Sequence, residues 1–206
     1  MLDILSSITN FENQRLKMVL WVRAVQSLIL IHCLWMSEAR QHSSVITVPN
    51  GGAWGTWGDV VLCPQGYAYG FSIKVQEYQG AFLWQDDTSL NSIRLYCTNG
   101  SAIESKAGPQ GTWSDVVKCS KGYLVAFSLQ VVGDQGIGDD VAANNIQFTC
   151  EDGATVVTKS HDWGTFGQWS QRCPEGYICG LQTKVEDMAG RIDETALNDV
   201  KMFCCK

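Results

Sequence analysis

The sequence predicts an all-β domain in which three sheets form the walls of a closed prism with internal pseudo-threefold symmetry. Three observations lead to this fold class: a unit of about 54 residues occurs three times, its apolar residues alternate with a period of two, and eight cysteines follow the N-terminal leader. Period-two alternation with β-branched and aromatic residues is typical of half-buried strands. A single unit cannot bury its apolar sheet face alone, so we expect three units to share one core.

The repeated unit consists of two sequence blocks. The first block reads GTWGDVVLCPQGYAYGFSIKV from Gly55, GTWSDVVKCSKGYLVAFSLQV from Gly111 and GTFGQWSQRCPEGYICGLQTKV from Gly164. The second block reads NSIRLYC from Asn91, NNIQFTC from Asn144 and NDVKMFC from Asn198. This self-similarity predicts a single domain, 40–206, made of repeats at about 45–98, 99–151 and 152–206.

Each first block contains one long strand with an alternating pattern. One face of this strand is expected to carry Tyr67, Tyr69, Phe71, Ile73 and Val75 in the first repeat, and Tyr177, Cys179, Leu181, Thr183 and Val185 in the third. The second block supplies a closing strand with the same alternation. Because residues 40–206 contain no long apolar pattern of period 3.6, we expect almost no helix there.

Residues 1–39 have the features of a secretory signal peptide. Arg23 precedes the apolar run 28–35, and Ser37 and Ala39 place small residues at the −3 and −1 positions for cleavage after Ala39. The run is shorter than the roughly 20 residues of a spanning helix, so a single anchor helix is the weaker alternative. Met18 is a second candidate initiator, which would make residues 1–17 an upstream extension. We therefore expect a secreted, extracellular protein.

The eight cysteines of the mature chain predict four disulfides, because an even number of cysteines in a secreted domain usually forms a disulfide framework. No CxxC pair is present, and the two mature histidines, His42 and His161, lie in unlike sequence contexts, which disfavours a metal site. We expect neither a metal nor a cofactor.

The repeat suggests which cysteines pair, because each unit has one cysteine before its long strand and one at the end of its closing strand. This gives Cys63–Cys97, Cys119–Cys150 and, by analogy, Cys173–Cys204, which leaves Cys179–Cys205. In an alternative scheme the last two pairs are Cys173–Cys205 and Cys179–Cys204, and strand parity slightly favours this alternative. We prefer the first scheme.

These features together resemble the vitelline membrane outer layer protein 1 family. The resemblance rests on the CPxGY turns at 63–67 and 173–177, the closing Asn-x-[Ile/Val] strands and the Cys204-Cys205 ending, and it extends from about residue 45 to the C-terminus. It implies a β-prism of three Greek-key sheets and a secreted protein of an egg outer coat or another secretion. It also implies binding or transfer of N-acetylglucosamine oligosaccharides. Ser120 replaces the proline of the second CPxGY turn, so that turn is expected to be looser.

Acidic pairs precede the closing strand in all three repeats. The pairs are Asp86 and Asp87, Asp139 and Asp140, and Asp193 and Glu194. Paired carboxylates are the groups that glycoside chemistry requires, and they also accept hydrogen bonds from sugar hydroxyls. However, Asp and Asn are common turn formers, so a turn role is favoured over glycan contact, and glycan contact over catalysis. Asp87, Asp140 and Glu194 are weak catalytic candidates, because no GxSxG, phosphate-loop or HExxH motif accompanies them.

Aromatic residues supply the remaining candidates for contact with a ligand. Glycine-rich turns contain Trp54, Trp57, Trp113, Trp163, Phe166 and Trp169, for which packing is favoured over sugar stacking. Trp84 lies in the insertion 81–85 of the first repeat and breaks the symmetry, so it is the better candidate for a glycan contact. His161 and Asp162 are interpreted as a loop pair. Asn99-Gly100-Ser101 is an N-glycosylation sequon in an expected exposed loop.

Charge and motif content limit the kinds of function that we expect for this chain. The net charge is −6 and there is no Lys/Arg cluster, which disfavours a nucleic-acid partner and a cationic membrane-surface role. We expect a monomer whose partners are extracellular coat glycoproteins or oligosaccharides. A structural or protective protein is favoured over an enzyme. The alternatives are a lectin-like glycan-binding module and a weak glycosyl transferase or hydrolase that acts on chito-oligosaccharides.

Overall fold

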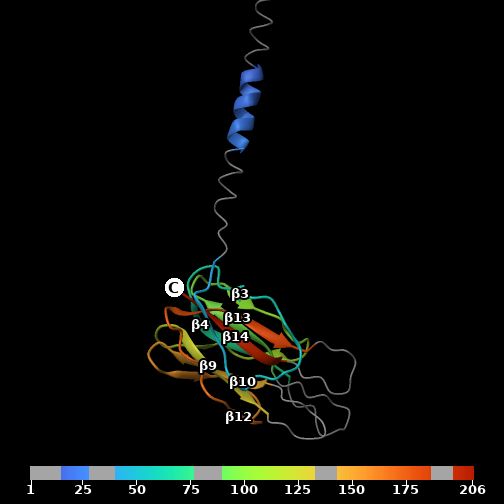
Figure 1. Ribbon diagram of the computed structural model, residues 1–206, viewed down its shortest axis with the longest axis vertical. Coiled ribbons are helices and arrows are strands. Elements are labelled where there is room, and N and C mark those ends of the chain that lie inside the picture. Colours follow the sequence, from blue (N-terminus) through green and yellow to red (C-terminus); the bar gives the residue numbers. More distant parts are fainter. Residues whose placement is uncertain (1–14, 28–39, 77–89, 133–142, 187–196) are drawn as a thin grey trace, which may run out of the picture. The chain divides into compact units, whose positions relative to one another are not determined.

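The computed structural model describes residues 15–27, 40–76, 90–132, 143–186 and 197–206 (Figure 1). The chain divides into two compact units, Met1–Ala39 and Arg40–Lys206, and this boundary coincides with the predicted cleavage position. In the first unit, residues 15–27 form a helix. Within the described ranges, no helix has the length and apolar character needed to cross a bilayer.

The second unit is built from three antiparallel sheets. Sheet 1 has the order β6-β5-β4-β7, with β8 also paired to β4, and contains β4 (Ala68–Val75), β5 (Leu90–Cys97), β6 (Ala102–Glu104), β7 (Thr112–Trp113) and β8 (Val117–Lys118). Sheet 2 has the order β11-β10-β9-β12 and contains β9 (Leu124–Val131), β10 (Ala143–Cys150), β11 (Thr155–Val157) and β12 (Thr165–Phe166). Sheet 3 has the order β1-β14-β13-β2, with β3 also paired to β13, and contains β1 (Ser44–Ile46), β2 (Thr56–Trp57), β3 (Val61–Leu62), β13 (Tyr177–Val185) and β14 (Leu197–Cys205).

Sheets 1 and 2 have Greek-key order, because two consecutive hairpin connections are followed by a strand that returns beside the first, and sheet 3 has the same spatial order of long, closing and short strands. The sheets are out of phase with the sequence repeats. A sheet takes the long strand and the closing strand from one repeat, and its short strands from the next repeat. In sheet 3 the short strands β1, β2 and β3 come from the beginning of the domain. The chain is therefore closed into a ring by its own N-terminal strands.

The three sheets share one hydrophobic core, as the alternation predicts. The long strands β4, β9 and β13, labelled in Figure 1, contact one another. Residues from all three sheets form one buried cluster. At its centre the ring of Phe148 lies 4.7 Å from that of Phe71 and 6.3 Å from that of Phe127, measured between centroids. The prediction of an all-β prism with a common core is confirmed.

A β-bulge near the start of the long strand interrupts the predicted alternation. In sheet 3 the register with β14 shifts between Ile178 and Gly180. As a result Ile178 belongs to the main core, whereas Cys179 packs on the other side of the sheet with Phe203 and Cys205. We call these last three residues the outer cluster. The expectation that Cys179 shares the face of Leu181 is therefore wrong, because the bulge adds one residue to the strand.

The disulfides follow the first pairing scheme. Three of them join neighbouring sheets, namely Cys63–Cys97 between sheets 3 and 1, Cys119–Cys150 between sheets 1 and 2, and Cys173–Cys204 between sheets 2 and 3. The fourth, Cys179–Cys205, joins β13 to β14 within sheet 3. The parity that favoured the exchanged pairs does not hold, because the bulge moves Cys179 to the outer face with Cys205.

Candidate functional site

The prism has two different ends, and tyrosines close the first of them. Tyr67, Tyr123 and Tyr177 stand at the start of the long strands, and their ring centroids are 4.7–5.3 Å apart. The Tyr177 hydroxyl donates a 2.6 Å hydrogen bond to Glu151, and this bond, with partial desolvation, raises the pKa of Tyr177. The Arg40 guanidinium lies 5.6 Å from the Tyr67 ring centroid. The three tyrosine rings therefore pack against one another at this end of the prism, which we call the tyrosine end.

At the opposite end, which we call the turn end, the long strands finish and the closing strands begin. The paired residues at this end are Val75 and Leu90, Val131 and Ala143, and Val185 and Leu197. The glycine that opens each GT[WF] motif lies against the end of a long strand. A Cβ on Gly55 would come within 2.5 Å of the Val185 carbonyl carbon, and its φ is +83°. Only glycine fits at this position, which explains why it opens all three motifs.

The predicted acidic residues occur in the sequence between these strand ends, and they lie outside the described residues. This applies to Asp86, Asp87, Asp139, Asp140, Asp193, Glu194 and Trp84. Their roles remain the predictions made from the sequence. The described part of the turn end consists of the strand termini and the turns that lead into the GT[WF] motifs.

Buried asparagines hold these turns in place. Asn91, Asn144 and Asn198, which open the second sequence block of each repeat, are fully buried. The side-chain amide of Asn144 donates to the carbonyls of His161, at 2.9 Å, and Trp163. The backbone carbonyls of Asn91 and Asn198 accept hydrogen bonds from Gly108 and Gly52, each at 2.7 Å. The asparagines therefore link the closing strands to the turns.

A second set of side chains holds the same turns from the long strands. Lys184 donates to the carbonyl of Ala53 at 2.6 Å, and Lys74 donates to that of Pro109 at 2.9 Å. Gln130, at the corresponding position of β9, donates to the carbonyl of Gly164 at 3.2 Å. Each turn is thus fixed by hydrogen bonds from two strands.

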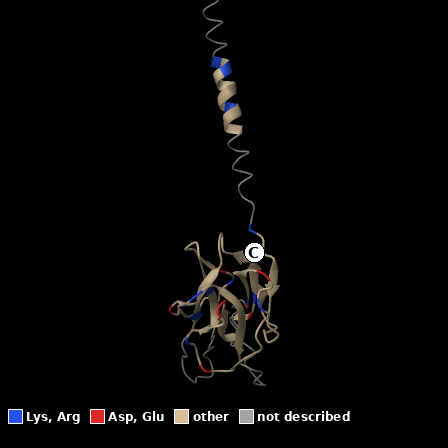
Figure 2. Ribbon diagram, turned by 90° about the vertical axis from the view of Figure 1, so that its left-hand side faces the viewer, with Lys and Arg blue, Asp and Glu red and all other residues tan. Residues whose placement is uncertain are grey.

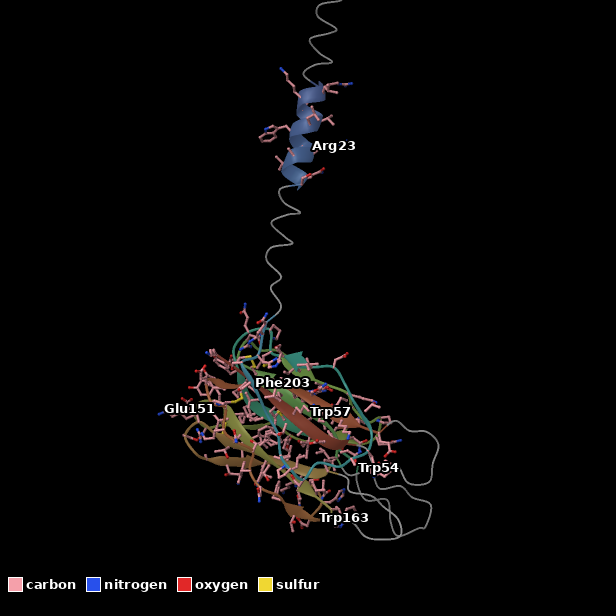
Figure 3. All side chains as sticks on the ribbon, in the orientation of Figure 1. Arg23, Trp54, Trp57, Glu151, Trp163 and Phe203 are labelled. Carbon is pink, nitrogen blue, oxygen red and sulfur yellow. A yellow bond between two sulfur atoms is a disulfide. The ribbon has the colours of Figure 1, made fainter. Side chains whose placement is uncertain are left out.

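The tryptophans of the GT[WF] region fall into two classes that the sequence does not separate. Trp57 and Trp113 are covered by cations, with the Lys201 ammonium 4.0 Å and the Arg94 guanidinium 3.9 Å from the ring centroids. These two residues pack, as predicted. Trp54 and Trp163, which lie three residues before Trp57 and Phe166, are 52% and 38% exposed (Figure 3).

Trp163 has a defined orientation although it is exposed. Its ring is stacked on the His161 imidazole, with centroids 4.6 Å apart and planes inclined by 16°. The Nε2 atom of His161 lies 2.8 Å from the carbonyl oxygen of Gln76, directly after β4. The prediction that His161 and Asp162 form a simple loop pair missed this contact, which brings the turn before β12 next to the end of β4.

Shallow cavities lie beside the GT[WF] motifs. A cavity of about 460 Å³ is lined by Trp57, Asp59, Glu104 and Lys106 among others, where β2 of sheet 3 meets β6 of sheet 1. A second, of about 250 Å³, is lined by Trp113, Ser114, Lys159 and His161, where sheets 1 and 2 meet. Both cavities are therefore lined by one tryptophan and by polar side chains.

The charges of the described residues are dispersed, with both signs interspersed over the prism (Figure 2). Asp199 is a half-buried carboxyl group at the turn end, where burial raises its pKa while the Val200 amide and the charges of Lys184 and Lys201 oppose that shift. The sequence analysis did not single it out, although it is the acidic member of the equivalent positions Ser92, Asn145 and Asp199. Among the described residues, no group of three or more His, Cys, Asp and Glu side chains is placed to hold a metal.

Comparison with known proteins identifies the family. The model of the family "Vitelline membrane outer layer protein I (VOMI)" matches residues 44–206. The vitelline membrane outer layer protein 1 homolog of Homo sapiens is 46% identical over 182 residues, which cover 84% of this chain and 89% of that protein. The homolog of Mus musculus is 44% identical over 173 residues, which cover 80% of this chain and 85% of that protein.

Among solved structures, the mannose-binding lectin from Champedak has a similar fold. Its TM-score is 0.51 at 14% sequence identity, and the match covers 82% of this chain and 99% of the lectin. The low identity means that this likeness shows the β-prism fold alone. The family match and the identity to both homologs show that this chain belongs to the vitelline membrane outer layer protein I family.

Proposed function

We propose that this chain is a secreted protein of an extracellular coat or secretion layer, in which it has a structural or protective role and binds carbohydrate. The observation that carries the structural part is the set of three disulfides that join every pair of neighbouring sheets. Such a framework is typical of proteins that persist in oxidising extracellular surroundings. Family membership supports the association with a coat.

The carbohydrate part of the proposal is supported by the fold and by the acidic pairs of the sequence. The Champedak lectin, whose fold is similar, is a mannose-binding protein. For this chain we propose N-acetylglucosamine oligosaccharides as the ligand, with the acidic pairs as acceptors for sugar hydroxyl groups. A carboxylate that accepts a hydrogen bond from a ligand contributes about 1.5–3 kcal/mol, so a few such contacts suffice for measurable affinity.

A glycan array with the oxidised chain 40–206 tests this proposal. We expect binding to chito-oligosaccharides, with affinity reduced about tenfold or more by Asp87→Asn, Asp140→Asn or Glu194→Gln, since each variant weakens one charge-assisted hydrogen bond. The thermal unfolding midpoint of each variant serves as the control and should stay close to that of the parent chain. Absence of binding at millimolar oligosaccharide would exclude the carbohydrate part.

We also propose that Asn99 carries an N-linked glycan. Asn99 lies in the turn between β5 and β6, exposed to solvent, and its side-chain oxygen accepts hydrogen bonds from Ser101 N at 3.1 Å and Ser101 Oγ at 2.8 Å. Gly100 between them has φ +88° and open space around it. The turn therefore presents the acceptor amide without obstruction.

Expression of the full chain in a secretory cell line should give a product whose mass falls on treatment with a peptide N-glycosidase, and Asn99→Gln should abolish that shift. The equivalent turn of the next repeat, at Asp152, Gly153 and Ala154, has the same glycine φ of +88° and no sequon. Asp152→Asn/Ala154→Ser should therefore create a second acceptor site. A parent chain without any such mass shift would refute the assignment of Asn99.

A further inference from the structure

Two of the exposed tryptophans among the described residues, Trp54 and Trp163, occupy equivalent places in the prism. Trp54 precedes Gly55, whose motif pairs with the end of β13, and Trp163 precedes Gly164, whose motif pairs with the end of β9. The second repeat has Gln110 at the corresponding position. The contact between His161 and Gln76 shows that the ends of β4 and β9 share the turn end. Two of three equivalent positions at this end therefore present an indole ring to solvent.

Neither residue belongs to the buried core cluster. The indoles that pack are those of Trp57 and Trp113, each covered by a cation. A tryptophan can bury 150–250 Å² of surface on packing, so leaving half of the Trp54 side chain in water forgoes much of that stabilisation. The forgone stabilisation points to a role in contact with another molecule.

The rings are also held on ordered backbone. Hydrogen bonds from Lys184 fix the carbonyl of Ala53 directly before Trp54, and the Asn144 amide fixes the carbonyl of Trp163 itself. The stack on His161 restricts the Trp163 ring further. A preorganised ring loses little conformational entropy when a ligand covers it, which favours affinity.

The surroundings of these rings are polar, and this decides the class of ligand. The Trp163 turn contains His161 and Asp162, and the Trp54 turn is bordered by Lys184 and the half-buried Asp199. A protein interface requires about 800 Å² on each partner, with an apolar centre larger than one ring. A single ring with hydrogen-bonding groups around it instead fits a pyranose, which has one apolar face and a rim of hydroxyl groups.

We propose that Trp54 and Trp163 are two equivalent stacking platforms for the sugar rings of an oligosaccharide chain. This inference rests on the proposed function and names residues of the carbohydrate site. Two platforms on one rigid domain favour a polymeric glycan over a monosaccharide, because binding at the first platform makes binding at the second intramolecular. The missing third platform at Gln110 makes the turn end asymmetric.

The test measures binding of N-acetylglucosamine hexamer and, separately, of mannopentaose to the oxidised chain 40–206 by calorimetric titration. Trp54→Ala and Trp163→Ala should each lower the affinity about three- to tenfold, and the double variant more, because each loses one aromatic stacking contact. Trp54→Phe and Trp163→Phe keep a ring and should retain most of the binding, so that loss of folding is distinguished from loss of contact. Gln110→Trp should raise the affinity.

Trp169→Ala is the matched control, because Trp169 is 41% exposed but does not occupy the equivalent position. An equal loss of affinity in this variant would overturn the inference, as would unchanged binding in the Trp54→Ala/Trp163→Ala double variant. If the double variant binds normally while Asp87→Asn does not, the platform assignment is wrong and the proposed function stands. If the parent chain binds neither oligosaccharide, the proposed carbohydrate function and the platforms both fail.

Discussion

Removal of the Cys63–Cys97 disulfide by Cys63→Ala/Cys97→Ala should lower the free energy of unfolding by about 4 kcal/mol. The bond closes a loop with a sequence separation of 34 residues, and the chain-entropy model assigns a value of this size to such a loop. Both sulfurs are also fully buried in the main core, so their removal leaves unfilled volume. For a domain of this size the unfolding midpoint should fall by roughly 8–16 °C.

Denaturant unfolding of the parent and the variant measures this difference, and hydrogen exchange locates it. The bond joins the end of β3 to the end of β5, so amides beside it, such as that of Thr98, should exchange faster. Cys179→Ala/Cys205→Ala is the comparison, because that bond lies within sheet 3 and should leave these amides protected. A loss below about 1 kcal/mol for the Cys63–Cys97 pair would show that the bond does not clamp the two sheets.

Phe148→Ala should destabilise the domain by about 3–5 kcal/mol, because it removes a fully buried ring that contacts phenylalanines of two long strands. Phe71 belongs to sheet 1 and Phe127 to sheet 2, so the substitution opens a cavity where two walls of the prism meet. Phe148→Leu retains most of the volume and should cost clearly less.

Urea unfolding at equilibrium measures these changes. Val157→Ala is a suitable control, since Val157 lies in the same sheet and is 46% exposed, and it should change the free energy of unfolding by less than about 0.5 kcal/mol. If Phe148→Ala and Val157→Ala had similar effects, the assignment of Phe148 to the centre of a shared core would be incorrect.

The sequence was sufficient for the fold class and the common core, because repeat period and alternation report directly on strands with one buried face. For the last two disulfides the analogy between repeats gave the observed pairs, whereas strand parity favoured the exchanged ones. It did not reveal the bulge at Ile178 and Gly180, since an added residue in a strand of mostly apolar residues leaves no break in the pattern. It also did not reveal the offset between sheets and repeats. Strands of two residues such as β2 and β7 have no periodicity, and their partners are decided only by tertiary packing.

The choice between tryptophan and phenylalanine in the GT[WF] motif was readable in part. Trp57 and Trp113 pair with Lys201 and Arg94, whereas Phe166 occurs in the sheet where the equivalent of these cations is Gln147. An indole thus occurs where a cation covers it, and a phenyl ring where none is available. This correlation between two positions of the repeat lies in the sequence, but the pairing of sheets across repeats is needed to recognise it.

The closure of sheet 3 by strands from the beginning of the domain has a consequence for biosynthesis. β1 pairs with β14, so the first segment of the domain to be translated must wait for the last. Until β14 has been made, sheet 3 has unpaired edges. Cys63 and Cys97 are already present at that stage, whereas β13, the partner of β3 next to Cys63, follows much later in the chain. A chain that ends before β14 therefore leaves β1 without its partner strand, and Cys173 and Cys179 without their disulfide partners.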